Sequence, residues 1–268
     1  MKSNTSTILA CALWLLACHS CRAWLSTSRT SAPRQRFFAA TTELFHRKTN
    51  SNDDGSTAII KKEDIRFLGR GENAIVRPGC VLVAPKHEFH HYYRRSAIFI
   101  HAMGEATDGS GDYVIRGLIL DHPTPFTLKE MMDHQPTVVE NPLGENFLFR
   151  GGDKGGDGVI LLHPHSDFGR PQIGMSGIYE GGWKEALEMC KTVSSSDNTV
   201  TENFKAFFNY CEFTENELED LLDSVEDGDA WVSLEVPVDF CLNPDFDRGD
   251  AWSLLRNAVQ QMEIPETQ

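Results

Sequence analysis

Histidine is the residue type in this sequence that most readily suggests chemistry, because the neutral imidazole ring binds metal ions and titrates near neutral pH. Six of the ten histidines fall in two groups along the chain: His87, His90, His91 and His101, and later His163 and His165. A zinc site needs three or four ligands that converge on one point. Pro164 interrupts the second group, and no cysteine or glutamate completes a known ligand spacing. We therefore predict histidines of loops and interfaces, and no metal site.

The other catalytic and cofactor-binding motifs are incomplete. The glycine-rich Arg150–Gly158 lacks the Gly-Lys-Ser/Thr end of a phosphate-binding P-loop, and no helix pattern follows it. Asp153 and Asp157 would also repel a phosphate group. No Gly-x-Ser-x-Gly motif is present, and nothing positions a base beside Cys80 or Cys211. The sequence thus predicts no catalytic residue and no cofactor.

The charged residues and histidines near the expected strand ends indicate a binding surface and not a catalytic site. The loops Pro85–Arg95 and Asp121–Pro123 follow apolar segments of the expected sheet, so their side chains would lie at neighbouring strand ends. The first loop ends in an aromatic and basic cluster that could bind an anion or a partner. The predicted surface consists of charged residues and histidines: Arg94, Arg95, His101, Asp121, His122 and His163.

Three short apolar segments must position these residues. Cys80–Ala84, Ser96–His101 and Val114–Leu120 are rich in β-branched or aromatic residues and are bounded by proline, glycine or charge, which is typical of strands. Because they show little alternation between apolar and polar residues, we predict strands that are covered on both faces.

Further strands are expected in the second half of the chain. Asn146–Phe149 and Val159–Leu162 would form a strand pair, joined by the glycine-rich segment as a hairpin. Phe204–Tyr210 and Trp231–Val236 are also predicted to be strands.

Helices are predicted from caps and from apolar periodicity. Thr127 with Glu130, and Thr214 with Glu217, form capping boxes that predict helix N-termini. Trp183–Val193 has apolar residues at i, i+3, i+4 and i+7, and the chain closes with a helix over about 249–262. Strands and helices do not alternate regularly, so the fold class is α+β.

The chain is acidic, with a net charge of −14 over 268 residues. Residues 1–52 carry seven basic side chains and one acidic side chain, a balance of +6, which leaves −20 for the rest of the chain. A body this acidic repels phosphate backbones, so we expect no direct binding of nucleic acid.

The N-terminus has the composition of a two-part targeting sequence. Lys2 precedes an apolar run, Ile8–Ala17, which is shorter than the roughly 20 residues of a membrane-spanning helix. Small and polar residues follow as far as Ala23, as in a signal peptide. The next segment is rich in serine, threonine and basic residues, as in a transit peptide.

This order, with the aromatic Trp24 directly after Ala23, resembles the bipartite presequences of algae with secondary plastids. We predict a signal peptide over residues 1–23, a transit peptide and linker over 24–56, and a single domain over 57–268. The expected location is the plastid, and the alternative is secretion. No membrane span is expected in the mature protein.

Several segments of the domain occur in the same order in one known family. Gly79–Pro85 is an apolar strand that ends in Ala-Pro, and Arg95–Ile100 is a second strand that opens with Arg-Ser. Gly117–Pro123 then runs from a third strand into a polar turn, and Gly151-Gly152 follows. With these motifs, Arg77–Phe240 resembles the YqgE/AlgH family, also called UPF0301 or DUF179.

The resemblance implies an α+β fold with a small, barrel-like mixed sheet flanked by helices. The family has no established biochemical activity. Two of its motifs differ in this chain: Asn-Arg-Pro is Asp121-His122-Pro123, and Gly-Gly-Pro-Val has lost its proline at Gly151-Gly152-Asp153-Lys154.

We therefore predict a non-enzymatic regulatory or interaction protein that binds a protein partner. One alternative is a small-molecule hydrolase or metal-dependent enzyme that uses His101, His163 and Asp121 in a single pocket. Another is a transcriptional regulator that acts through protein partners and does not hold DNA itself.

Overall fold

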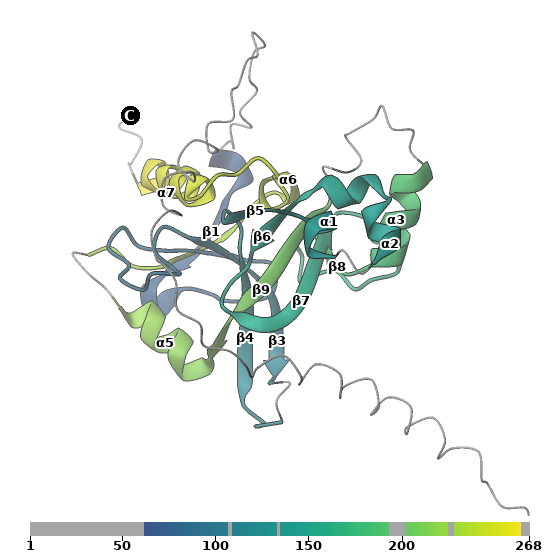
Figure 1. Ribbon diagram of the computed structural model, residues 1–268. Helices are drawn as coiled ribbons and strands as arrows, with labels where there is room; N and C mark the ends of the chain where they lie inside the picture. Colours follow the sequence, from purple (N-terminus) through teal and green to yellow (C-terminus); the bar gives the residue numbers. More distant parts are fainter. Residues whose placement is uncertain are drawn as a thin grey trace, which may run out of the picture. The chain divides into compact units, whose positions relative to one another are not determined.

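The structure is a computed structural model that describes residues 62–106, 109–132, 135–192, 201, 203–224 and 228–263 (Figure 1). They belong to the second of the two units into which the chain divides, Ser56–Gln268. The expected signal and transit segments, residues 1–56, lie outside the described residues. Within the described ranges, no helix is long and apolar enough to cross a membrane.

The strands join into one mixed sheet. Their bounds are β1 Arg66–Arg70, β2 Val81–Val83, β3 Ala97–Glu105, β4 Tyr113–Ile119, β5 Pro123–Thr127, β6 Phe147–Arg150, β7 Lys154–His163, β8 Tyr179–Glu180, β9 Lys205–Thr214 and β10 Val232–Glu235. The helices are α1 Leu128–Met131, α2 Pro136–Val139, α3 Trp183–Thr192, α5 Glu215–Asp223, α6 Val238–Cys241 and α7 Asp250–Glu263. Short 3-10 helices cover Lys62–Asp64, Gly71–Asn73, Pro142–Glu145 and Ser166–Phe168.

The strand order is β1-β10-β2-β3-β4-β9-β6-β5, with β7 also beside β9 and β8 beside β7. Strands β6 and β9 are parallel, and the other pairs are antiparallel. The three apolar segments that open the domain are β2, β3 and β4, and they are neighbours, as in the register Val81 to Phe99 to Leu118. The α+β class is confirmed.

Both faces of these central strands are buried, which explains their unbroken apolar sequences. On one face Val83 and Phe99 pack in a cluster with residues of α6 and α7, including Leu255. On the other face Ile98 and Ile119 pack with Leu222 of α5. Figure 1 shows α7 and α5 on opposite sides of the sheet. Each fully buried side chain of this size contributes about 2 kcal/mol.

A third cluster lies where β6, β7 and β9 meet the helices α1 and α3. Leu148 and Leu161, on β6 and β7, pack with Phe204, and α3 contributes Ala186 and Cys190. This part of the molecule carries the groove described below.

The predicted hairpin between β6 and β7 is wrong, because β9 lies between them. Leu148 of β6 and Leu161 of β7 both pair with Ala206 of β9, one from each edge. The chain therefore passes from one side of β9 to the other at Gly151 and Gly152. A Cβ atom on Gly152 would lie 2.1 Å from the backbone carbon of Tyr210, so only glycine fits this crossing.

The expectation of a barrel-like sheet needs a correction, because the sheet does not close. The small strand β8 pairs with β7, and its Tyr179 also forms an isolated bridge with Gln172. A side-chain contact links β8 to β3: His101 Nδ1 lies 2.8 Å from Glu180 Oε2. The sheet is thus open.

Both predicted capping boxes are confirmed. The Thr127 hydroxyl accepts from the Glu130 N–H at the start of α1, and the Glu130 carboxylate accepts from the Thr127 N–H. Thr214 and Glu217 make the same pair of bonds at the start of α5.

Candidate functional site

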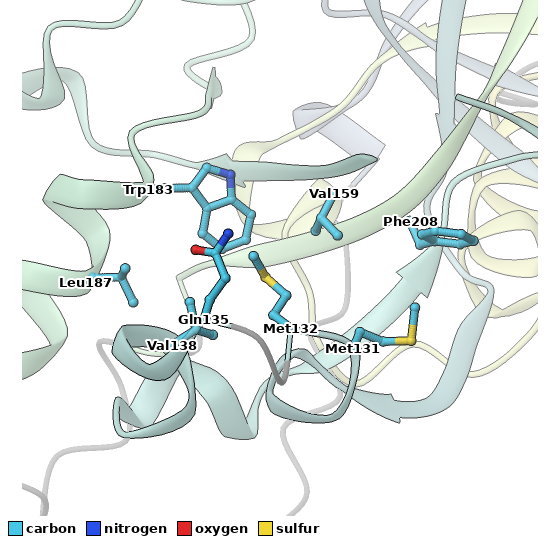
Figure 2. A pocket seen from close by; sticks show the side chains of 8 residues that line it. All are labelled: Met131, Met132, Gln135, Val138, Val159, Trp183, Leu187 and Phe208. Carbon is cyan, nitrogen blue, oxygen red and sulfur yellow. The ribbon is translucent and has the colours of Figure 1, made fainter. Parts of the chain in front are cut away.

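An open apolar groove lies between α1 and α2 on one side and α3 on the other, over strands β7 and β9 (Figure 2). Its volume is about 620 Å³, which is within the usual size of binding pockets. The lining residues are mostly apolar: Met131, Met132, Gln135, Val138, Val159, Trp183, Leu187 and Phe208.

The sequence of α3 explains one wall of the groove. Ala186 and Cys190 are turned into the third cluster and are buried. Trp183 and Leu187 are one turn apart on the neighbouring part of the helix surface, and both remain partly exposed. The apolar stripe of α3 is thus wider than the core needs, and its outer part faces the groove (Figure 2).

The opposite wall is built from methionines. Leu128 of α1 is fully buried, whereas Met131 is 40% exposed and Met132 is partly exposed. Methionine side chains are unbranched and adaptable, and they are common on surfaces that bind apolar segments. Among the described residues of the lining, Gln135 is polar and none is charged. The described part of the lining therefore offers mainly apolar contact area.

The floor of the groove continues into a stacked arginine. Phe208 of β9 is paired in register with Val159 of β7 on one edge and with Arg150 of β6 on the other. The Arg150 guanidinium lies 4.8 Å from the centre of the Tyr92 ring, a cation–π contact. Its Nη2 donates to the Tyr92 hydroxyl at 3.1 Å, and its Nε donates to the Gly152 carbonyl at 3.2 Å.

Three of the predicted surface residues lie together next to this arginine. The Arg95 guanidinium is 5.7 Å from the Trp252 ring of α7. The Trp252 backbone N–H donates to Asp121 Oδ2 at 3.2 Å. The carbonyl of His122 accepts from the Arg150 N–H at 2.8 Å. Arg94 is exposed in the same turn as Arg95. The two loops therefore meet, as expected from the order of the strands.

Asp121 and His122 are not free to act as surface groups. Asp121 is fully buried, and burial raises the pKa of its carboxyl to about 7. Burial, together with the charges of Arg248 and Arg150, lowers the pKa of His122 to about 4. Both shifts favour the neutral forms, so the exposed cations of this region are arginines.

Lys205 is a structural residue that the sequence analysis missed. It is buried in β9, and its Nζ donates to the carbonyls of Leu120 at 2.8 Å, Asn243 at 2.6 Å and Cys241 at 3.4 Å. The Nζ also lies 4.2 Å from the centre of the Phe149 ring. Burial lowers the pKa of Lys205 to about 7. The signal was a single lysine inside the apolar run Phe204–Phe208.

His101 and His163 lie in separate surroundings. His101 is paired with Glu180. His163 Nδ1 accepts from the His165 backbone N–H at 3.1 Å, its ring packs against Phe168, and burial lowers its pKa to about 4. Asp121 accepts from the Trp252 backbone N–H, and among the described residues no hydrogen bond or ion pair joins it to either histidine.

No metal site is found among the described residues. Within the ranges that the structure describes, no three His, Cys, Asp or Glu side chains are grouped so that they could hold a metal ion.

Comparison with known proteins gives a family and a fold. Residues 81–265 match the model of the family DUF179, described as AlgH-like. A crystal structure of a protein from Corynebacterium diphtheriae is similar, with 16% identity and a TM-score of 0.50, over 74% of this chain and 91% of that chain. The solution structure of the AlgH protein from Pseudomonas aeruginosa, UPF0301, has 15% identity and a TM-score of 0.44, over 68% and 87%. Comparison with curated protein sequences gives no match.

Proposed function

Because the chain belongs to the AlgH-like family, DUF179, we propose that it is a non-enzymatic regulatory protein that binds a protein partner through the apolar groove. The observation that carries this proposal is the lining of the groove. Trp183, Leu187 and Met132 are partly exposed around a floor of Phe208 and Val159, and no titratable side chain is among them. Contiguous exposed apolar surface on a soluble protein marks an interaction site.

The shape of the groove supports a macromolecular occupant. It lies between two helical walls (Figure 2), and it is neither an enclosed cavity nor a flat surface. Aromatic residues and methionine are enriched at protein–protein interfaces, where a few of them supply most of the binding energy. The protein would then regulate by binding its partner in the groove, without catalysing a reaction.

A photo-crosslinker placed in the groove tests this proposal. With p-benzoylphenylalanine at Met131, we expect one or a few discrete adducts in the cells that make the protein. The same residue at Phe67 of β1 is the matched control, since Phe67 is 46% exposed and Met131 is 40% exposed. The variant Leu187→Glu puts a charge on the groove wall and should reduce the Met131 adducts at least fivefold. The proposal is overturned if Met131 and Phe67 give the same adducts, or if Leu187→Glu leaves them unchanged while the variant stays folded.

The plastid is proposed as the place where this binding happens. The supporting observation is the order of segments at the N-terminus: the apolar run Ile8–Ala17, then Ala23 and Trp24, then a basic segment rich in serine and threonine. We propose removal of residues 1–23 as a signal peptide and of a transit peptide within 24–56. The domain that remains would begin near residue 57.

A fluorescent fusion of residues 1–55 tests the proposed location in the plastid. We expect plastid fluorescence in an alga with secondary plastids, and secretion when residues 24–55 are deleted. Uniform cytosolic fluorescence, or secretion of the full fusion, would contradict the plastid proposal and leave the binding proposal untouched.

A further inference from the structure

We propose that the groove takes an amphipathic helix of the partner, and that this helix carries acidic residues at the end that reaches Arg150. The inference rests on the proposed function and specifies the partner's chemistry at the same site. Two observations carry it: the pairing of the groove floor, and the position and hydrogen bonds of Arg150.

The strand pairing favours a helix over an extended peptide. An extended segment that binds to a sheet gains its affinity by adding a strand to a free edge. At Phe208, the strand β9 has β6 on one edge and β7 on the other, so its backbone groups are already paired. A segment that lies over Phe208 cannot pair with β9 there, so an α-helix, which satisfies its backbone N–H and C=O groups internally, fits this part of the groove best.

The walls of the groove suit the side chains of such a helix. Trp183 and Leu187 on α3 face Met132 and Val138 across the opening (Figure 2). A helix laid along this opening would insert apolar residues at i, i+3, i+4 and i+7 between the two walls. The methionines can adjust to side chains of different shape.

Arg150 determines the charge that fits at one end. It is paired in register with Phe208, and adjacent strands are about 4.8 Å apart, so Arg150 lies one strand beyond the Phe208 floor. Its hydrogen bonds go to neutral acceptors, the Tyr92 hydroxyl and the Gly152 carbonyl. The guanidinium is exposed and is held in place by the Tyr92 ring. A carboxylate of the partner can therefore pair with a cation that is already oriented.

The rest of the surface makes this cation selective. The chain beyond residue 52 carries a net charge of −20, so an acidic segment gains no general attraction to the domain. A helix with acidic residues at one end would be accepted in the orientation that places them on Arg150, and rejected in the reverse orientation. Charge pairs of this kind set register and specificity more than raw affinity.

Selection from a displayed library of random 16-residue peptides tests the inference. Against the wild-type domain, we expect peptides with apolar residues at helical spacing and with Asp or Glu enriched at one end. Against Arg150→Gln, the apolar pattern should persist and the acidic enrichment should disappear. Arg150→Lys should retain most of the enrichment, and Arg66→Gln, which removes the same charge from β1, should retain all of it. A selected acidic peptide should bind Arg150→Gln about 5- to 10-fold more weakly than wild type.

The outcomes separate the two proposals. If no helical apolar pattern is selected by the wild-type domain, or if Leu187→Glu does not abolish that pattern, the groove proposal fails and the inference fails with it. If the apolar pattern appears without acidic enrichment, or with enrichment that Arg150→Gln does not affect, the inference alone is overturned. If light scattering shows a dimer that Leu187→Glu converts into a monomer, the occupant is a second copy of this chain, and the inference is again overturned.

Discussion

Lys205→Met is expected to lower the free energy of unfolding by about 3 kcal/mol or more, although the substitution is close in volume and adds no charge. The Lys205 Nζ is the donor for the carbonyls of Leu120, Asn243 and Cys241. Methionine would leave these carbonyls without this donor in a buried place, and it would also remove the contact with the Phe149 ring. The connection between β9, the end of β4 and the segment after α6 would be weakened.

Urea unfolding followed by tryptophan fluorescence measures the loss. The matched control is Lys191→Met, because Lys191 is exposed on α3 and is expected to change stability by less than about 0.5 kcal/mol. Equal midpoints for the two variants would contradict the structural role of Lys205.

The difference in stability between wild type and Lys205→Met is expected to depend on pH. The pKa of Lys205 is lowered to about 7 in the folded state, whereas an unfolded lysine titrates near ~10.4. Between these values the unfolded chain binds the proton and the folded protein does not, so this residue makes the free energy of unfolding rise with pH. Lys205→Met lacks that rise, and its deficit relative to wild type should therefore be larger at pH 9.5 than at pH 7. A deficit that shrinks over this range would show that the lysine is not buried as described.

Local signals in the sequence were sufficient for most of the elements. The capping boxes at Thr127 and Thr214 involve residues three positions apart, and both helices begin where they predict. The apolar segments of β2, β3 and β4 are consecutive in the chain and pair as neighbours, so their short connections determine their order. The joint position of Arg95, Asp121 and His122 follows from this order.

The errors come from pairings between distant segments. Nothing in Phe147–Arg150 and Lys154–His163 shows that a strand some 50 residues later will separate them, because their apolar residues would satisfy a hairpin equally well. Lys205 is another case, since its carbonyl partners belong to Leu120, Cys241 and Asn243. Local periodicity contains no information about such contacts.

The groove was missed for a similar reason. The periodicity of α3 correctly predicts an apolar face that includes Trp183, Ala186 and Leu187. It does not show that Ala186 is buried while Trp183 and Leu187 stay partly exposed. That division depends on how far α1 and α2 extend over the same cluster. Only the folded structure shows that Trp183 and Leu187 belong to the part of the apolar face of α3 that the core leaves exposed.

Gly152→Ala is the second large effect, and it tests the crossing that separates β6 from β7. The added Cβ would lie 2.1 Å from the Tyr210 carbonyl carbon and 2.2 Å from its oxygen, so backbone would have to move. We expect a loss of about 3 kcal/mol, or failure to accumulate as folded protein. Gly104→Ala is the matched control, because Gly104 lies in β3 and its Cβ would meet no atom within 4 Å.

The chemistry of the two substitutions is identical, so a difference between them isolates the crossing. If Gly152→Ala is as stable as Gly104→Ala in urea unfolding, the chain does not pass β9 at this distance. The hairpin between β6 and β7 would then be the better description, and Phe208 would have a free strand edge in the groove. A helical partner would then no longer be favoured, since an extended peptide could pair with that edge.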